Sequence, residues 1–320
     1  MAYLLPSYAI IAPMSSGSSF KTWVVLLILG TIWGASYLFI KVGGEEIPPV
    51  TFVAVRVTVA ALAVAVVLLA RRQAFPAPLR AIWLPLLVMG LTNGVIPYTL
   101  ITWGETEISS GLAGILVATM PIFTVIFAHL ATQDEKLNRY KLLGIGIGFM
   151  GVVLLFLPDI EKGITPSFVG TLATIVAAVS YGFATVFAHK YLRRVSNLAA
   201  EFGQLASAAV VLVPVSLALD HPWTLRPSLP AAASLLTLAL LGTAFAYLLY
   251  YWLIEHAGPT STSLVTYISP VTSILLGALV LHEQFDWTAF VGFAGIVAGV
   301  TLVSRSAPEQ AQPPVGVEAE

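Results

Sequence analysis

Residues 50–70 read VTFVAVRVTVAALAVAVVLLA, a continuous apolar run that contains one charged side chain, Arg56. A helix that crosses the hydrocarbon core of a bilayer needs about 20 mostly apolar residues, so this stretch alone predicts a membrane-spanning helix. The composition of the 320-residue chain agrees, because 58% of its residues are hydrophobic and only 10% are charged. An ordinary soluble domain has roughly 25% charged residues. The sequence therefore predicts an integral membrane protein.

Working outward from this stretch, nine more segments have the same character. We expect ten transmembrane helices near residues 22–42, 50–70, 81–103, 109–131, 139–157, 167–189, 198–219, 231–254, 260–281 and 287–304. The runs are longer than the roughly ten-residue strands of a membrane β-barrel, so the predicted fold class is an all-α membrane protein. Residues 1–21 are predicted to be an N-terminal segment, with Met14 as a second candidate start, and residues 305–320 a disordered tail.

Basic residues predict the orientation, since Lys and Arg concentrate on the cytoplasmic side of membrane proteins. With the N-terminus inside, the outer loops hold only Lys162 and Arg226. Eleven basic residues then lie on the inner side: Lys21, Arg71, Arg72, Arg80, Lys136, Arg139, Lys141, Lys190, Arg193, Arg194 and Arg305. We therefore expect both termini to be cytoplasmic, in a multi-pass protein of a bacterial-type inner membrane.

The two halves of the chain resemble each other at an offset of 148–149 residues. The matched pairs include Arg56 with Gln204, Tyr98 with Tyr247, Trp103 with Trp252, Pro121 with Pro270, Glu135 with Glu283, Gly144 with Gly292 and Gly151 with Gly299. We predict one five-helix repeat at 22–157, an outer linker at 158–166 and a second repeat at 167–304. Five is odd, so the second repeat is inverted in the membrane, an architecture that recurs in secondary transporters.

These residues resemble the drug/metabolite transporter superfamily, in its ten-helix EamA-type branch. The resemblance rests on Trp33-Gly34 followed by Lys41, on Arg56, on Pro121, and on Glu135 with Gly144 and Gly151. It covers about residues 20–305 and implies a secondary transporter, usually an exporter of amino acids, related metabolites or drugs. It does not imply a particular substrate.

Aromatic residues are the first candidates for a substrate site. Trp33, Tyr37 and Lys41 follow one another at intervals of four residues, so they share one helix face, and Tyr181 repeats the position of Trp33 in the second half. Polar aromatic groups at mid-span need a partner or a cavity. We interpret these residues as a cavity wall, with helix packing as the alternative. Tyr98 and Tyr247 are candidate gates at opposite ends, or members of the interfacial aromatic belts.

The next candidates interrupt or cross-link helices. Pro121 and Pro270 each leave a carbonyl without its helical donor, so we predict hinges there, with Tyr267 among the nearby polar groups on a possible ligand surface. Simple kinks satisfied by neighbouring side chains are the alternative. Asn93 is either a ligand contact or, as we favour, a contact between helices.

Ionisable residues within spans mark functional sites by default. Arg56 is expected either to pair with Glu45 or Glu46 or to hold an anionic group of the substrate. Lys41 is predicted to snorkel outward or to join the site. Glu201 is predicted to form an ion pair with Lys190 or Arg193, with proton transfer as the alternative.

Other classes of function lack their motifs. The sequence has no Walker A motif, no H-E-x-x-H and no G-x-S-x-G, so we predict no enzyme, no cofactor, no metal site and no nucleic-acid partner. We expect a secondary exporter of small amphipathic metabolites such as amino acids, working by alternating access in a lipid bilayer, and a homodimer is one option. An antiporter of phosphorylated sugars or nucleotide sugars and a lipid-headgroup flippase are the alternatives.

Overall fold

A computed structural model describes residues 20–71, 79–131, 137–160, 165–193, 195–262 and 264–305. The predicted N-terminal segment before Phe20, with Met14, lies outside the described residues, as do Glu135 and the predicted tail after Arg305. The described helices are α1 (Phe20–Gly44), α2 (Pro49–Ala70), α3 (Leu79–Met89), η1 (Gly90–Val95), α4 (Ile96–Glu107), α5 (Ser110–Val117), α6 (Met120–Ala131), α7 (Arg139–Ile160), α8 (Pro166–Tyr191), α9 (Asn197–Leu219), η2 (Pro222–Thr224), α10 (Leu229–Thr237), η3 (Leu238–Phe245), α11 (Ala246–Thr262), α12 (Val265–Val280) and α13 (Trp287–Arg305).

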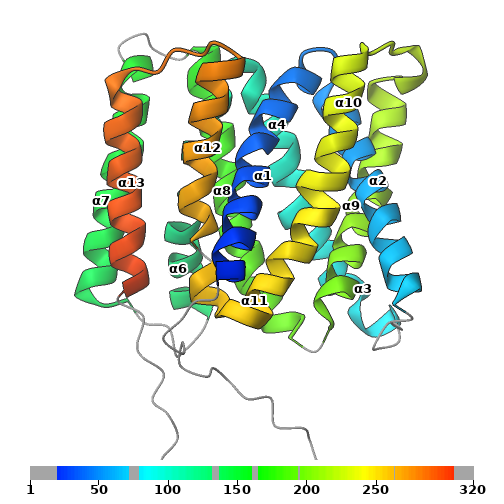
Figure 1. Cartoon of the computed structure of the whole chain (residues 1–320), viewed down its shortest axis with the longest axis horizontal. Coiled ribbons are helices and arrows are strands. Elements are labelled where there is room, and N and C mark those ends of the chain that lie inside the picture. Colours follow the sequence, from blue (N-terminus) through cyan, green and yellow to red (C-terminus); the bar gives the residue numbers. More distant parts are fainter. Residues whose placement is uncertain are drawn as a thin grey trace, which may run out of the picture.

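Eight helical segments of the described chain are long and apolar enough to cross a membrane, and the shorter helices α12 and α13 are also apolar. The chain is therefore an all-helical, multi-pass membrane protein in its described parts (Figure 1). Two helices continue past the predicted ends of their spans. Helix α7 extends to Ile160 and α11 to Thr262, whereas the apolar spans within them end at Leu157 and Ile254, as predicted.

The third span of each half contains a π-helical turn. In the first half η1 separates α3 from α4, and in the second half η3 separates α10 from α11. The two turns begin at Gly90 and Leu238, which are related by the same 148-residue offset as Arg56 and Gln204. π-Turns are rare and are frequent at functional sites. They place backbone irregularities of both halves in the middle of the bundle.

The two mid-span prolines have different effects on their helices. The fourth span is split into α5 and α6 by a turn at Ala118–Thr119, just before Pro121. The hydroxyl of Thr119 donates to the carbonyl of Leu116 at 2.6 Å, which helps to satisfy the broken backbone. Helix α12 instead runs through Pro270 without interruption. Only the first proline coincides with a break in its helix, and the predicted hinge motion at both remains a prediction.

Helices α7 and α13, the last of each half, stand together at one side of the bundle (Figure 1). Glycines let their backbones approach closely. A Cβ built on Gly144 would lie 2.6 Å from the carbonyl oxygen of Gly299, and one on Gly151 would lie 2.6 Å from that of Gly292. The matched glycines therefore meet in crossed pairs between α7 and α13, Gly144 with Gly299 and Gly151 with Gly292, as glycine spacing predicts for helix packing.

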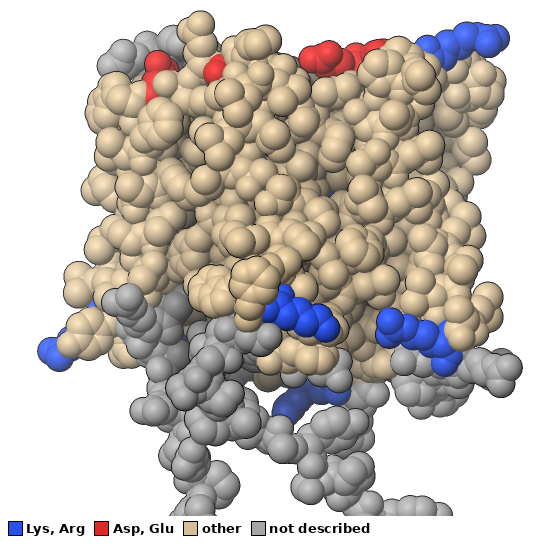
Figure 2. Space-filling model, viewed as in Figure 1, with Lys and Arg blue, Asp and Glu red and all other residues tan. Residues whose placement is uncertain are grey.

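Charged residues separate to the two ends of the bundle. Figure 2 shows Asp and Glu at the end where α1 meets α2 and α12 meets α13, and mostly Lys and Arg at the opposite end. We call these the acidic end, with Glu45, Glu46, Asp220 and Glu283, and the basic end, with Lys21, Arg71, Arg139 and Lys190. The broad band between them is almost free of charge on the face shown, as a lipid-facing surface requires.

Candidate functional site

Arg56 occupies the junction between the two halves of the chain. Its side chain is 6% exposed. The guanidinium carbon lies 3.9 Å from the centre of the Tyr98 ring, and Nε–H donates to the hydroxyl of Thr243 in η3 at 3.0 Å. The pairing with Glu45 or Glu46, one of the two options that we expected, is not found among the described residues, where Glu46 accepts hydrogen bonds from Ser228. The sequence places Arg56 within span 2, but its partners come from other helices and from both halves.

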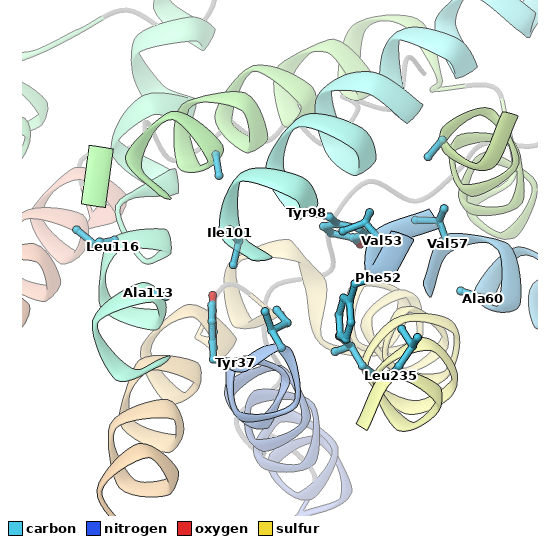
Figure 3. Packing of buried hydrophobic residues seen from close by; sticks show 14 of the residues in the cluster. Tyr37, Phe52, Val53, Val57, Ala60, Tyr98, Ile101, Ala113, Leu116 and Leu235 are labelled. Atoms are coloured by element: carbon cyan, nitrogen blue, oxygen red, sulfur yellow. The ribbon is translucent and has the colours of Figure 1, made fainter. Parts of the chain in front are cut away.

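Three tyrosines lie near this guanidinium, and one of them, Tyr98, is in contact with it. The rings of Tyr98 and Tyr181 lie edge to face with centres 6.4 Å apart. Tyr37 and Tyr98 are buried, and the hydroxyl of Tyr37 points away from α1 toward the space between Ile101 and Ala113 (Figure 3). The structure thus brings three predicted site residues together beside Arg56. Their role in binding substrate remains a prediction.

Trp33 and Tyr247 form the adjoining aromatic group. Their ring centres are 5.9 Å apart, and Tyr250 packs against both rings. Tyr247 also interacts with Tyr98 through its side chain. The two tyrosines that we considered as gates at opposite ends therefore lie next to each other.

Asn93, Gln204 and Glu201 form a chain of hydrogen bonds near the basic end. Asn93 Nδ2 donates to Gln204 Oε1 at 3.0 Å, and Gln204 Nε2 donates to the carboxylate of Glu201. Tyr251 also donates to this carboxylate at 3.4 Å. The expected ion pair of Glu201 with Lys190 or Arg193 is wrong. Glu201 lies inside the bundle, 1% exposed, whereas both basic side chains are exposed. Asn93 joins η1 to α9, which is the helix contact that we favoured.

The arrangement repeats across the two halves. Arg56 in α2 contacts η3 of the second half, and its counterpart Gln204 in α9 contacts η1 of the first half. Each second helix therefore contacts the π-turn of the opposite half. The residues at the matched position differ in charge, so only one of these two junctions carries a cation.

Lys41 and Glu105 lie at the acidic end and were not predicted to meet. The ammonium of Lys41 donates to the carbonyls of Glu105 and Ile108, the latter at 3.0 Å, so it does not simply snorkel outward. Glu105, in the last turn of α4, is 1% exposed. Among the described residues, neither of its carboxylate oxygens has a hydrogen-bond partner. The sequence did not single out Glu105, because span 3 was expected to end at Trp103.

Three other acids at the acidic end bind backbone donors of helix N-termini across the two halves. Glu46 accepts from Ser228 before α10, Asp220 from Thr51 in α2, and Glu283 from Ser110 and Gly111 in α5. The side-chain and backbone hydrogen bonds from Ser228 lower the pKa of Glu46 below its usual value of 4.5. Carboxylates at helix N-termini are favourable. These contacts hold the two halves together at this end.

The remaining predicted residues lie away from Arg56. Tyr267 in α12 accepts a hydrogen bond from Thr301 of α13 at 3.3 Å. Pro270 is buried within α12, and its carbonyl accepts a hydrogen bond from Ser273. The described residues contain no group of three His, Asp or Glu side chains that could hold a metal.

Known proteins are similar to this chain in sequence and in fold. The profile of the EamA-like transporter family matches residues 21–157 and, a second time, residues 168–305. The chain belongs to the EamA-like transporter family. The resemblance inferred from its motifs is therefore confirmed, and the protein is a membrane transporter of this family.

Individual relatives cover most of the chain. The uncharacterized inner membrane transporter YedA of Escherichia coli (strain K12) is 30% identical over 283 residues, which cover 87% of this chain and 89% of that protein. The uncharacterized transporter YoaV of Bacillus subtilis (strain 168) is 27% identical over 282 residues, 88% of this chain and 96% of that protein. A probable terminal-alkyne amino-acid exporter of Streptantibioticus cattleyicolor is 26% identical over 287 residues, 88% and 93% of the two chains.

One crystal structure has a similar fold, with a TM-score of 0.62 and 19% identity over 90% of this chain and 99% of that one. At this identity the likeness shows the fold alone.

Proposed function

We propose that this protein is a secondary transporter that exports small amphipathic metabolites, amino acids foremost, by alternating access between two inverted halves of five spans each. The observation that carries the proposal is the buried guanidinium of Arg56 at the junction of the halves. A guanidinium has five N–H donors, and within the described part of the chain only Nε–H has a hydrogen-bond acceptor. The remaining donors suit a carboxylate, which binds Arg in a bidentate manner.

The position of Arg56 supports a role in transport. It contacts α4 of the first half through Tyr98 and η3 of the second half through Thr243. A substrate carboxylate bound here would contact groups that belong to both halves, so their relative movement would change its exposure to either end. The relative named as an amino-acid exporter supports amino acids as the substrate class.

The distribution of charge supports an orientation. The basic end lies in the cytoplasm, with both termini, and the acidic end faces the outside of a bacterial-type inner membrane. Reporter fusions at Arg72, Lys141 and Arg194 should then read cytoplasmic, and fusions at Glu46, Glu161 and Arg226 external. If residues 72 and 194 read on opposite sides, the second half would not be inverted relative to the first.

A ligand screen tests the substrate class. Thermal unfolding of the purified protein in detergent should be followed with the common amino acids, L-norvaline and L-propargylglycine, and with sugar phosphates, nucleotide sugars and lipid headgroups, each at millimolar concentration. A ligand that binds only the folded protein stabilises it by RT ln(1 + [L]/Kd), so weak binders are also detected. We expect stabilisation by a subset of amino acids. Stabilisation only by sugar phosphates, nucleotide sugars or lipid headgroups would contradict the proposal and favour an antiporter or a flippase.

A further inference from the structure

A small cavity opens at the acidic end, between the ends of α1 and α4. It has a volume of about 240 Å³ and is lined by Ile40, Lys41, Gly44, Glu45, Thr102, Glu105 and Thr106. Glu45 and Thr106 are exposed, whereas Thr102 and Glu105 are buried, so the cavity leads from the surface to two buried polar side chains. Pockets for drug-sized ligands have roughly 300–1,000 Å³. The volume therefore suits a smaller metabolite.

The polar groups at the bottom of the cavity lack partners. Neither oxygen of Glu105, nor the hydroxyl oxygen of Thr102, has a hydrogen-bond partner among the described residues, and each side chain is 1% exposed. Buried polar groups in folded proteins are nearly always satisfied. Three other acids at this end, Glu46, Asp220 and Glu283, accept hydrogen bonds. Glu105 differs from them, and a cationic ligand group would satisfy it.

Lys41 places a positive charge in the same cavity. Its ammonium donates to the carbonyls of Glu105 and Ile108, which fixes it at the C-terminal end of α4. An ammonium has three N–H donors, and these two hydrogen bonds leave one. Lys41 and Glu105 both line the cavity but form no direct ion pair within the described residues, so groups of opposite charge face one space.

We propose that this cavity binds the zwitterionic head of an amino acid, with its ammonium on Glu105 and its carboxylate on Lys41. Thr102 supplies a further hydrogen bond to either group. A phosphate dianion would meet the negative charges of Glu45 and Glu105, and a plain cation would meet Lys41, so the charge pattern selects a ligand that carries both signs. This inference rests on the proposed function and extends it, because it adds a binding site beside the acidic-end surface that is separate from Arg56.

The test is equilibrium binding by calorimetry with three matched ligands. L-Norvaline carries both charges, its methyl ester lacks the carboxylate, and 2-hydroxypentanoate lacks the ammonium. Wild-type protein should bind norvaline at least about tenfold more tightly than either analogue, since hydrogen bonds to charged groups are the strong ones.

Substitutions in the protein test which side chain binds which charged group of the ligand. Glu105→Gln should weaken norvaline at least about tenfold and leave 2-hydroxypentanoate unchanged. Lys41→Gln should weaken norvaline similarly and leave the methyl ester unchanged. The Lys41 change also removes hydrogen bonds to α4, so Gly44→Val provides an independent test. A Cβ on Gly44 meets only Thr102, at an ordinary 3.7 Å, and the added side chain should fill the cavity and abolish binding in it, while both of its charges and the separate group of Arg56 stay intact.

The matched control is Glu107→Gln, an exposed acid two residues from Glu105 that does not line the cavity. It should bind norvaline like the wild-type protein. Norvaline affinity within twofold of wild type in both Glu105→Gln and Gly44→Val would overturn the site and leave the proposed function standing. Failure of the wild-type protein to bind norvaline or any other amino acid of the screen would overturn the proposed function as well.

Discussion

Two glutamates, Glu105 near the acidic end and Glu201 near the basic end, are equally buried, at 1% exposure, yet their surroundings differ. Glu201 accepts hydrogen bonds from Gln204 and Tyr251, and Asn93 extends this network to η1. Glu105 has no hydrogen-bond partner among the described residues and lines a cavity. Burial alone therefore does not identify a functional acid. An acid that accepts hydrogen bonds from other helices holds these helices together, and a buried acid without such bonds beside a cavity is available to a ligand.

Substituting the two glutamates should have unequal effects on the free energy of unfolding, and this is the largest difference that we expect. Glu201→Ala should lower the free energy of unfolding by about 2–4 kcal/mol, because it leaves the side chains of Gln204 and Tyr251 without their acceptor. Glu105→Ala should change it by less than about 1 kcal/mol, since no hydrogen bond is lost. Thermal unfolding in detergent measures both, with Glu107→Ala as control. Equal destabilisation by the two substitutions would show that the hydrogen bonds of Glu201 do not distinguish it from Glu105.

Arg56 interacts electrostatically with both acids. Its substitution tests whether the guanidinium binds the substrate. Glutamine already occupies the matched position, Gln204, so Arg56→Gln should fold and insert. We expect transport of amino acids in proteoliposomes to fall about tenfold to a hundredfold, as expected for the loss of a hydrogen bond to a charged group. Neutral analogues should be unaffected. A loss of thermal stability with equal loss for every substrate would instead make Arg56 structural.

Asn93 belongs to the same hydrogen-bond network as Glu201, and its substitution tests whether this network is structural. Asn93→Leu removes the hydrogen bond between η1 and α9 and should cost about 1 kcal/mol of stability. The relative affinities for norvaline and its two analogues should not change. A change in these relative affinities would show that Asn93 contacts the ligand, the alternative that the sequence left open.

The smallest expected effect concerns Glu46, a bonded acid at the same end as Glu105. Its folded-state pKa is lowered by hydrogen bonds from Ser228, so its contribution to stability is present above the ordinary value of 4.5 and is lost as pH falls through the lowered folded-state value. The stability difference between wild type and Glu46→Gln should therefore shrink at acidic pH. A difference that persists unchanged would show that the hydrogen bonds do not depend on the charge.

The sequence predicted the parts of this molecule that follow from local patterns. Apolar runs gave the helices, and the glycines at 144, 151, 292 and 299 gave the close packing of α7 with α13. Counting Lys and Arg anticipated the basic end, and the span position of Arg56 marked it as a candidate site residue.

The partners of these residues could not be read from the sequence. Arg56 meets Thr243 across 187 residues, and the π-turn that positions Thr243 has no clear sequence signature. Glu105 was missed because α4 continues to Glu107, beyond the expected end of the span, and buries a residue that looked like part of a loop. Long-range packing, which one sequence does not specify, decided which acid was bonded and which was free.

Efflux from proteoliposomes measures whether the protein transports an amino acid and whether the cavity at the acidic end is needed for transport. Vesicles loaded with radiolabelled norvaline should contain the wild-type protein, Gly44→Val or Glu107→Gln in equal amounts, with protein-free vesicles as reference. We expect vesicles with wild-type protein or Glu107→Gln to release norvaline faster than protein-free vesicles, and vesicles with Gly44→Val to release it at the protein-free rate. Release by the wild-type protein at the protein-free rate, for norvaline and for every other amino acid in the screen, would contradict this expectation.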